Sequence, residues 1–254
     1  MWKFGFASVL GTSHARTGTP LQDACAAEVV TDAAGVTVLV AVASDGAGSA
    51  TQAQIGSRLA CELFLADVKD YFVSGGTVAQ LAQEFIVRWI ARFQQAVQQQ
   101  AGTQAIVDYA CTLLAAVISP ESAVYFQLGD GAMVAATREQ ADAFTIVCWP
   151  QQGEYANTTN FLTDADAAAK CFFARHEHVV DEVALFTDGI QNLVLDYRNR
   201  AAHAPFFTPL FAWLRPRATG FSEELSASLA VYLNSDKINA RTDDDKTLLL
   251  ATRR

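Results

Sequence analysis

The segment that decides the fold runs from Val36 to Leu63 and reads VTVLVAVASDGAGSATQAQIGSRLACEL. It begins with an almost unbroken apolar run, Val36 to Ala43, with the β-branched residues typical of a strand buried on both faces. It ends with a helical pattern, because Ile55, Leu59 and Leu63 recur every fourth position on one face. The segment therefore predicts a central strand followed by an amphipathic helix.

The turn between that strand and that helix, Ser44-Asp45-Gly46-Ala47-Gly48, places one acid among small residues. A carboxylate at the end of a buried strand is costly to desolvate unless a partner compensates its charge. Gly46 and Gly48 allow the backbone to turn sharply and to approach a ligand closely. The turn predicts a cation bound at Asp45.

The composition of the chain fits a globular protein and argues against several kinds of partner. With 254 residues, 51% of them hydrophobic, and no linker or internal repeat, one domain over residues 1–254 is favoured. The net charge of -9 argues against binding nucleic acid, because the phosphate backbone requires a basic face. No apolar run is long enough to span a membrane and no cleavable signal is seen, so we expect a cytoplasmic protein. Five scattered cysteines are expected to be reduced core residues and not zinc ligands: Cys25, Cys61, Cys111, Cys148 and Cys171.

Short strands and amphipathic helices share the chain, which predicts an α+β protein. Strands are expected at residues 2–10, 25–30, 36–43, 111–118, 123–128, 132–136, 144–148, 183–186 and 247–251. Helices are expected from about Ser49, around 81–93, and at 205–214 and 223–233. Residues 11–22 are expected to form a turn-rich loop, and the strands from 111 to 148 an antiparallel meander. The polar stretch 150–165 is either a flap that selects substrates or a structural loop.

One feature recurs at the ends of the predicted strands, namely an acid in a turn that borders an apolar run. Asp130 and Asp188 share this position with Asp45, and Asp244 or Asp245 opens the last strand. If the strands lie side by side, the carboxylates gather at one edge, where two unit charges about 4 Å apart repel by about 4 kcal/mol at an effective dielectric of 20. Such a cluster needs divalent cations or raised pKa values. Ligands that are all oxygen favour Mg²⁺ or Mn²⁺ over zinc or copper.

Six short motifs occur in a fixed order over nearly the whole chain. They are Gln22-Asp23, Ser44-Asp45-Gly46-Ala47-Gly48, Ala110-Cys111-Thr112, Leu128-Gly129-Asp130, Phe186-Thr187-Asp188-Gly189 and Asp244-Asp245-Lys246-Thr247-Leu248. Each is weak alone, but as an ordered set they resemble the metal-dependent phosphatases of the protein phosphatase 2C (PPM) family, and especially its compact bacterial members. The resemblance implies a four-layer α-β-β-α sandwich, with two antiparallel sheets face to face and helices on each outer face.

The resemblance also implies the ligands of a two-metal site that holds Mg²⁺ or Mn²⁺. Asp45 would bridge two ions, with the Gly46 carbonyl on one of them. Asp188 and Asp244 would complete the other. Asp130, together with Asp188, matches the acids that hold a third ion in family members.

The implied mechanism is hydrolysis without a covalent phosphoenzyme. Two cations about 3.5–4 Å apart deprotonate a bridging water, which attacks the phosphorus in line. Asp23 would hold and orient the metal-bound water. It therefore counts as a residue of the metal site and, with Asp45 and Asp188, as a catalytic residue.

Three positions depart from the pattern of the family. Members often carry an Arg five residues before the aspartate of the first motif, where it binds the substrate phosphate, and this chain has Gly18 there. His14 or Arg16 in the same loop could bind the phosphate instead, and an exposed loop position is an equal alternative for each. Gln22 replaces an acid. Ala47 replaces a His that protonates the leaving group, so the general acid is unassigned.

Three functions fit these observations, and the first is our prediction. It is a Mg²⁺- or Mn²⁺-dependent phosphatase of phosphoserine and phosphothreonine in proteins, which opposes a bacterial serine/threonine kinase in signalling. The second is a catalytically weak or inactive phosphatase-fold protein that binds a phosphorylated partner. The missing Arg and His favour this alternative, and the full set of acids disfavours it. The third is a hydrolase of small phosphoesters.

Overall fold

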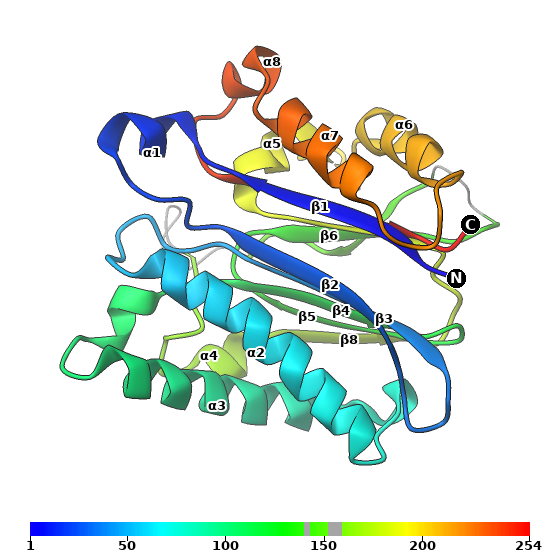
Figure 1. The fold of residues 1–254 in the computed structure, drawn as a ribbon, viewed down its shortest axis with the longest axis horizontal. Coiled ribbons are helices and arrows are strands. Elements are labelled where there is room, and N and C mark those ends of the chain that lie inside the picture. The colour runs from blue at the N-terminus through cyan, green and yellow to red at the C-terminus, as the bar shows by residue number, and fades with distance from the viewer. Residues whose placement is uncertain (140–142, 152–158) are drawn as a thin grey trace.

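Two β-sheets packed face to face form the centre of the protein, and helices cover both outer faces (Figure 1). The structure is a computed structural model that describes residues 1–139, 143–151 and 159–254. The predicted α+β class and four-layer α-β-β-α sandwich are confirmed. Residues 152–158 of the predicted flap lie outside the described residues, so its role stays a prediction.

The first sheet has six strands in the order β12-β1-β13-β9-β6-β7. Neighbouring strands are antiparallel, except that β12 runs parallel to β1. The bounds are β1 Lys3–Val9, β6 Ala132–Ala136, β7 Thr145–Cys148, β9 Glu182–Phe186, β12 Gly220–Phe221 and β13 Lys246–Thr252.

The second sheet has five strands in the order β2-β3-β4-β5-β8, all antiparallel to their neighbours. The bounds are β2 Ala24–Thr31, β3 Thr37–Ser44, β4 Leu113–Ile118, β5 Ala123–Leu128 and β8 Phe172–His176. A separate small hairpin pairs β10 Leu195–Asp196 with β11 Ala201–Ala202.

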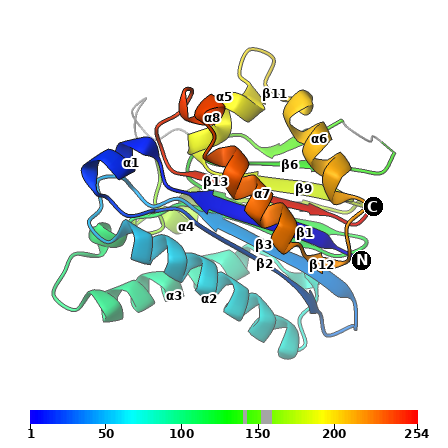
Figure 2. The same cartoon turned by 45° about the horizontal axis from the view of Figure 1, so that its top comes forward.

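Helices pack on the outer face of each sheet (Figures 1 and 2). The second sheet is covered by α2 Ala53–Val73, α3 Gln83–Ala101 and α4 Ala167–Lys170. The first sheet is covered by α5 Gln191–Val194, α6 Ala204–Leu214 and α7 Glu223–Leu233. The remaining short helices are α1 Thr12–Thr17, η1 Val78–Gln80, η2 Ile106–Tyr109, η3 Asp188–Ile190 and α8 Asp236–Asn239. Among helices in the described ranges, none combines the length and apolar character needed to cross a bilayer.

The central strand β3 is buried on both faces, as its unbroken apolar run predicts. Successive side chains of a strand point to opposite faces, so its residues enter two cores. Val38, Val40 and Val42 pack beneath the helices, whereas Leu39, Ala41 and Ala43 pack between the sheets, all with no exposed area. This double burial fixes where β3 ends, and with it the position of Asp45.

The prediction of a loop over residues 11–22 is wrong in part, because Thr12–Thr17 forms the short helix α1. The helix has no buried residue and therefore no apolar period that a sequence pattern could reveal. A long-range contact fixes its start, since the Ser13 amide donates to the Asp243 carbonyl at 2.8 Å. Gly18 ends it in the left-handed conformation at φ 73°.

The predicted antiparallel meander is wrong in part, because its strands pair as two antiparallel hairpins that divide between the two sheets. β4 and β5 pair in the second sheet, whereas β6 and β7 pair in the first. The chain crosses from one sheet to the other at Gly129-Asp130-Gly131, where Gly129 adopts φ 109°, a conformation that favours glycine. This crossing places Asp130 between the sheets at their edge.

Candidate metal centre

The ends of four strands from both sheets deliver acids to one cleft. β3 ends before Asp45, β5 before the turn that holds Asp130, and β9 just before Asp188, while β13 begins just after the acidic turn that holds Asp244. All four acids line a cleft of about 170 Å³, together with Gly46. His14 of α1 is among the lining residues, so the cleft lies at the end of the sandwich where Figure 2 shows α1.

Three of these acids form a tight group. Asp45, Asp130 and Asp188 each offer a carboxylate oxygen, and the three oxygens lie within 4.8 Å of one another. Burial, followed by the charges of Asp23 and Asp188, raises the pKa of Asp45 well above its ordinary value. Burial, followed by the charges of Asp130 and Asp244, raises the pKa of Asp188 to about 7. Burial is also the main cause that raises the pKa of Asp130.

The carboxylate group fits divalent cations. Like charges this close and this buried are unfavourable, so the group must either retain protons or bind positive charge. Its donors are all oxygen, and the Asp130 Oδ1 atom is buried with no hydrogen-bond partner among the described residues. Hard cations that prefer oxygen ligands, such as Mg²⁺ and Mn²⁺, match this donor set.

Thr112 fixes the end of β3 and thereby the backbone of Asp45. The Ser44 hydroxyl donates to the Thr112 carbonyl at 2.6 Å. The Asp45 amide donates to Thr112 Oγ1 at 2.9 Å, and the Thr112 amide donates to the Asp45 carbonyl at 2.8 Å. The motif Ala110-Cys111-Thr112 therefore positions an acid and is not itself part of the acid group.

Asp23 is a buried carboxylate that two threonines hold in place. Its Oδ2 atom accepts hydrogen bonds from Thr187 Oγ1 and Thr247 Oγ1, both at 2.8 Å. Its Oδ1 atom is buried and has no hydrogen-bond partner among the described residues. Burial raises the pKa of Asp23 to about 7, although the two hydroxyl donors lower it in part. One oxygen is thus anchored, and the other is left for a further donor.

Gly189 allows the end of β9 to approach the start of β13. A Cβ atom added at Gly189 would lie 1.8 Å from the Asp245 carbonyl oxygen, far closer than atoms can approach. The Asp-Gly pair at 188–189 is therefore a requirement of close packing as well as of a turn. It brings Asp188 beside the acidic turn at 243–245.

The three consecutive acids of that turn have three different environments. Asp243 is exposed and lies 3.3 Å from Arg16. Asp245 is buried, and its carboxylate accepts from the amides of Gly11 at 2.6 Å and Gln22 at 2.7 Å. Asp244 lines the cleft, outside the tight group of three. Of the two candidates, Asp244 and not Asp245 therefore faces the metal centre.

His14 and Arg16 take opposite positions on α1. His14 lines the cleft, and its Nδ1 atom lies 3.0 Å from Asp245 Oδ2. Arg16 has a side chain that is 69% exposed, pairs with Asp243 and is not among the residues that line the cleft. Ala47 lines the cleft where family members often carry a His.

Residues that sequence patterns did not single out also build the site. Thr112, Thr187 and Thr247 lie inside the recognised motifs, but their roles as hydrogen-bond donors and acceptors required the structure. Thr159 and Phe161 line the cleft from the end of the predicted flap. A polar, irregular stretch was the only signal for these two.

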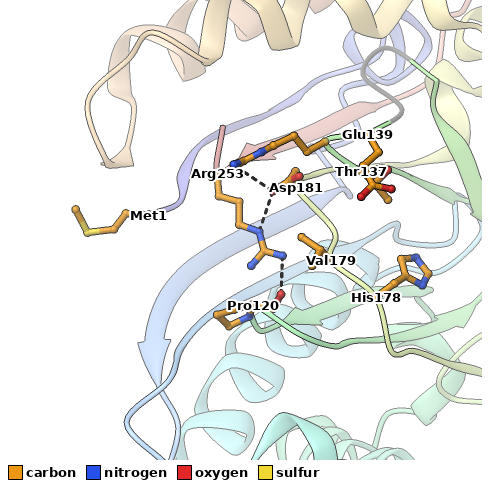
Figure 3. Close-up of a pocket in the computed structure, with 9 residues that line it drawn as sticks. Met1, Pro120, Thr137, Glu139, His178, Val179, Asp181 and Arg253 are labelled. Atoms are coloured by element: carbon orange, nitrogen blue, oxygen red, sulfur yellow. Dashed lines mark hydrogen bonds and ion pairs between the residues drawn. The ribbon is translucent and has the colours of Figure 1, made fainter.

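A larger cavity lies at the other end of the sandwich and is unrelated to the acid group. Its volume is about 740 Å³, and it is lined by Arg138, His178, Asp181 and Arg253 among others. The Arg253 guanidinium lies 3.4 Å from buried Asp181 and donates to the Pro120 carbonyl at 3.2 Å (Figure 3). In the part of the chain that the structure describes, a group of three metal-ligating side chains occurs only at the small cleft.

The sandwich and its acidic cleft have the form expected of a hydrolase that uses bound cations. The profile of the family described as "Protein phosphatase 2C" matches residues 10–234. The "Serine/threonine-protein phosphatase 3" of Escherichia coli (strain K12) is 34% identical over 252 aligned residues, and the match covers 98% of each chain. The chain therefore belongs to the protein phosphatase 2C family.

Solved structures of bacterial phosphatases share the fold. The S. agalactiae serine/threonine phosphatase matches with a TM-score of 0.66 at 12% identity, covering 100% of both chains. Serine/threonine phosphatase Stp1 from Staphylococcus aureus matches with a TM-score of 0.63 at 16% identity, covering 100% of this chain and 96% of that one. Family membership confirms the predicted resemblance and the predicted class, a serine/threonine protein phosphatase. It does not favour the alternative of an inactive binding protein.

Proposed function

We propose that this protein is a Mg²⁺- or Mn²⁺-dependent phosphatase whose substrates are proteins that a serine/threonine kinase has phosphorylated. The observation that carries the metal dependence is the group of Asp45, Asp130 and Asp188, whose oxygens lie within 4.8 Å of one another. We further propose that residues 1–254 are one catalytic domain. The core that the two sheets share supports this.

The proposed ligands in the cleft would hold two or three metal ions. Asp45 and the Gly46 carbonyl lie at the end of β3, and Asp188 and Asp244 face them from the first sheet. Asp130 would join Asp188 at a third position. When bound, the ions would supply a water of lowered pKa and would neutralise charge on the phosphoryl oxygens.

Asp23 is proposed to orient the attacking water. Its anchored oxygen cannot turn away, because Thr187 and Thr247 hold it from two different strand ends. Its other oxygen is buried beside the acid group and has no protein donor among the described residues. A carboxylate oxygen in this position accepts a hydrogen bond from water and directs its lone pair toward the substrate.

His14 is proposed to bind the substrate phosphate in place of the arginine missing at Gly18. Its Nδ1 atom is buried against Asp245, which itself is fixed by the amides of Gly11 and Gln22. This arrangement leaves Nε2 as the ring nitrogen available in the cleft. Arg16 is the second candidate, and it would first have to leave Asp243.

The test is phosphate release from a phosphothreonine peptide in the presence of Mn²⁺. We expect turnover by the wild type and a loss of at least about 100-fold in Asp45→Asn, because the variant removes a charge that the cations need. Asp166→Asn is the matched control, since Asp166 is an exposed acid paired with Lys170 and should leave turnover unchanged. Metal content measured by mass spectrometry should fall in the first variant only.

Two outcomes would contradict the proposal. Binding of the peptide without turnover by the Mn²⁺-loaded protein would favour a phosphoprotein-binding role. Faster turnover of a nucleotide or sugar phosphate than of the peptide would favour a hydrolase of small phosphoesters.

A further inference from the structure

Two aromatic rings and an arginine form a shelf beside the metal cleft, which we call the Trp149–Tyr197–Arg200 shelf. The Tyr197 ring meets the Trp149 ring edge-on, with centroids 5.3 Å apart and planes at 79°. The Arg200 guanidinium lies 5.1 Å from the centroid of the Trp149 ring. Tyr197 and Arg200 are exposed and Trp149 is half-buried. An arginine over a tryptophan face is an attractive pair that also holds the guanidinium in one place.

Hydrogen bonds from one buried side chain attach this shelf to the acid group. The Gln127 amide nitrogen donates to the carbonyls of Gly129 at 3.2 Å and Gly131 at 2.9 Å, the residues on each side of Asp130. The same nitrogen donates to the Trp149 carbonyl at 3.1 Å. Trp149 is thereby fixed to the turn that carries a proposed metal ligand.

Tyr197 lies in the turn of the β10–β11 hairpin, which packs against the strand that leads to Trp149. It follows Asp188 along the chain through η3 and α5, and its hairpin packs beside β7, which ends just before Trp149 (β11 next to α5 in Figure 2). Burial, followed by the charges of Asp188 and Asp130, raises the pKa of Tyr197. The phenol is therefore within electrostatic reach of the acid group.

Hydrogen bonds close the hairpin that carries Arg200, and its backbone is strained at that residue. The Asp196 carboxylate accepts from the Asn199 amide at 3.0 Å and from its side chain at 2.7 Å, which closes the turn. Arg200 has φ 49°, and in the described part of the chain it is the one non-glycine residue with positive φ. Glycine or asparagine would adopt this conformation at lower cost than arginine, by roughly 1 kcal/mol. Such strain often marks a position where a side chain serves binding.

The charge of the shelf is opposite to that of its surroundings. The chain carries a net charge of -9, and the cleft is lined by four carboxylates. Arg198 and Arg200 are both exposed on the β10–β11 hairpin, where they outnumber the one carboxylate of Asp196 and give the hairpin net positive charge. A phosphorylated segment with further acids would meet attraction here and repulsion at bare carboxylates elsewhere.

We infer that the Trp149–Tyr197–Arg200 shelf selects phosphoprotein segments that carry an acidic side chain close to the phosphorylated residue. Arg200 pairs with that carboxylate, and the two rings cover the aliphatic part of the bound segment. This inference rests on the proposed function and adds the substrate class. It makes Arg200 a specificity residue that contributes nothing to the hydrolysis step itself.

The test compares two phosphothreonine peptides, one with glutamates and one with alanines on both sides of the phosphothreonine, with p-nitrophenyl phosphate as a substrate that has no flanking residues. We expect the wild type to prefer the glutamate peptide about three- to fivefold in kcat/KM, the size expected of an exposed ion pair, and to lose the preference at high salt. Arg200→Asn should remove the preference and leave p-nitrophenyl phosphate turnover unchanged. Its melting temperature should stay level or rise, because asparagine relieves the strained φ. If Arg200 served only to stabilise the fold, Arg200→Asn would keep the preference for the glutamate peptide and would have a lower melting temperature.

Arg217→Gln is the matched control, because Arg217 also stacks on a tryptophan, Trp213, at 3.9 Å but sits after α6, away from the cleft. It should retain the preference. If Arg200→Asn hydrolyses p-nitrophenyl phosphate and still prefers the glutamate peptide, the inference that the shelf selects acidic segments is wrong, and the proposed function is unaffected. If no substrate is hydrolysed, the proposed function fails. In that case, fluorescence anisotropy measures the affinity of the wild type for hydrolysis-resistant phosphonate versions of both peptides. Equal affinities would reject the inference that the shelf selects acidic segments.

Discussion

Asp188, a proposed metal ligand, lowers the folding stability of the metal-free protein at neutral pH. Burial and two neighbouring acids raise its pKa to about 7, from an ordinary value of 3.8. The unfolded chain loses this proton near pH 4, whereas the folded chain retains it until about pH 7. Between these values the folded state binds more protons, so the free energy of unfolding of the metal-free protein falls as pH rises. Asp23 has a pKa raised to about 7 as well and acts in the same direction.

We therefore predict that Asp188→Asn stabilises the protein when metal is removed. With a chelator at pH 7.5, the variant should exceed the wild type by about 2 kcal/mol in free energy of unfolding, less than the full linkage value because the acids share their repulsion. At pH 3 the difference should nearly vanish, since that pH lies below both pKa values and Asp188 is then largely protonated in both states. Urea denaturation at the two pH values measures it.

Added Mn²⁺ supplies the control for this prediction. The cations should stabilise the wild type and not the variant, which reverses their order at pH 7.5. A wild type that is more stable than Asp188→Asn in the chelator at pH 7.5 would show that the carboxylates do not repel one another as the geometry requires.

At the scale of elements, α1 separates two residues that the sequence leaves equivalent. The helix is held against the acidic turn by the Ser13 amide and by the Gly11 amide on Asp245. Because residues two apart lie on opposite sides of a helix of about 3.6 residues per turn, His14 then lines the cleft and Arg16 faces solvent. The choice between them depends on a contact more than 200 residues away in sequence, so no local pattern could make it.

This placement predicts a difference between variants of the two residues. His14→Ala should raise KM for p-nitrophenyl phosphate by about tenfold, the loss of one charge-assisted hydrogen bond, with a smaller change in kcat. Arg16→Ala should change neither constant, which makes it the matched control on the same helix. Steady-state kinetics with saturating Mn²⁺ measures both. An effect of Arg16→Ala alone would assign phosphate binding to Arg16, and equal effects of the two variants would contradict the assignment to His14 alone.

The positions of the strands could be predicted from the sequence more easily than their pairing within the sheets. The apolar run of β3 and the four-residue spacing in α7 define elements directly, because burial imposes a period that the sequence must satisfy. The acids at strand ends could be identified for the same reason. The sequence did not show which sheet each strand joins. The strands β5 and β6 have similar apolar runs, and the chain passes from one sheet to the other between them, at Gly129, whose φ of 109° no sequence pattern reveals. Thr187 and Thr247, which donate hydrogen bonds to Asp23, are not part of any hydrophobic period, so the sequence pattern could not predict their role.

At the scale of the whole molecule, the acids at the two ends of the sandwich have opposite electrostatic surroundings. At one end the half-buried Asp45, Asp130 and Asp188 bring carboxylate oxygens, and with them like charges, within 4.8 Å of one another. At the other end Glu182 is fully buried but bonded to the Arg215 guanidinium at 2.8 and 2.9 Å and to Thr252 at 3.0 Å. Strand β9 connects the ends, with Glu182 and Asp188 six residues and about 20 Å apart.

The paired end should therefore respond to substitution in the opposite sense from the metal end. Glu182→Gln removes the buried carboxylate charge that accepts two hydrogen bonds from the Arg215 guanidinium, and we expect it to lower the free energy of unfolding by about 2–4 kcal/mol. Glu224→Gln is the control, because Glu224 pairs with Arg217 at the surface with 66% of its side chain exposed, and should cost less than about 1 kcal/mol. Turnover at 25 °C with Mn²⁺ should be unchanged in both, since neither side chain reaches the cleft. If Glu182→Gln lost activity in proportion to stability, the two ends would be coupled along β9, and the acids at the metal end would depend on the ion pair at the other.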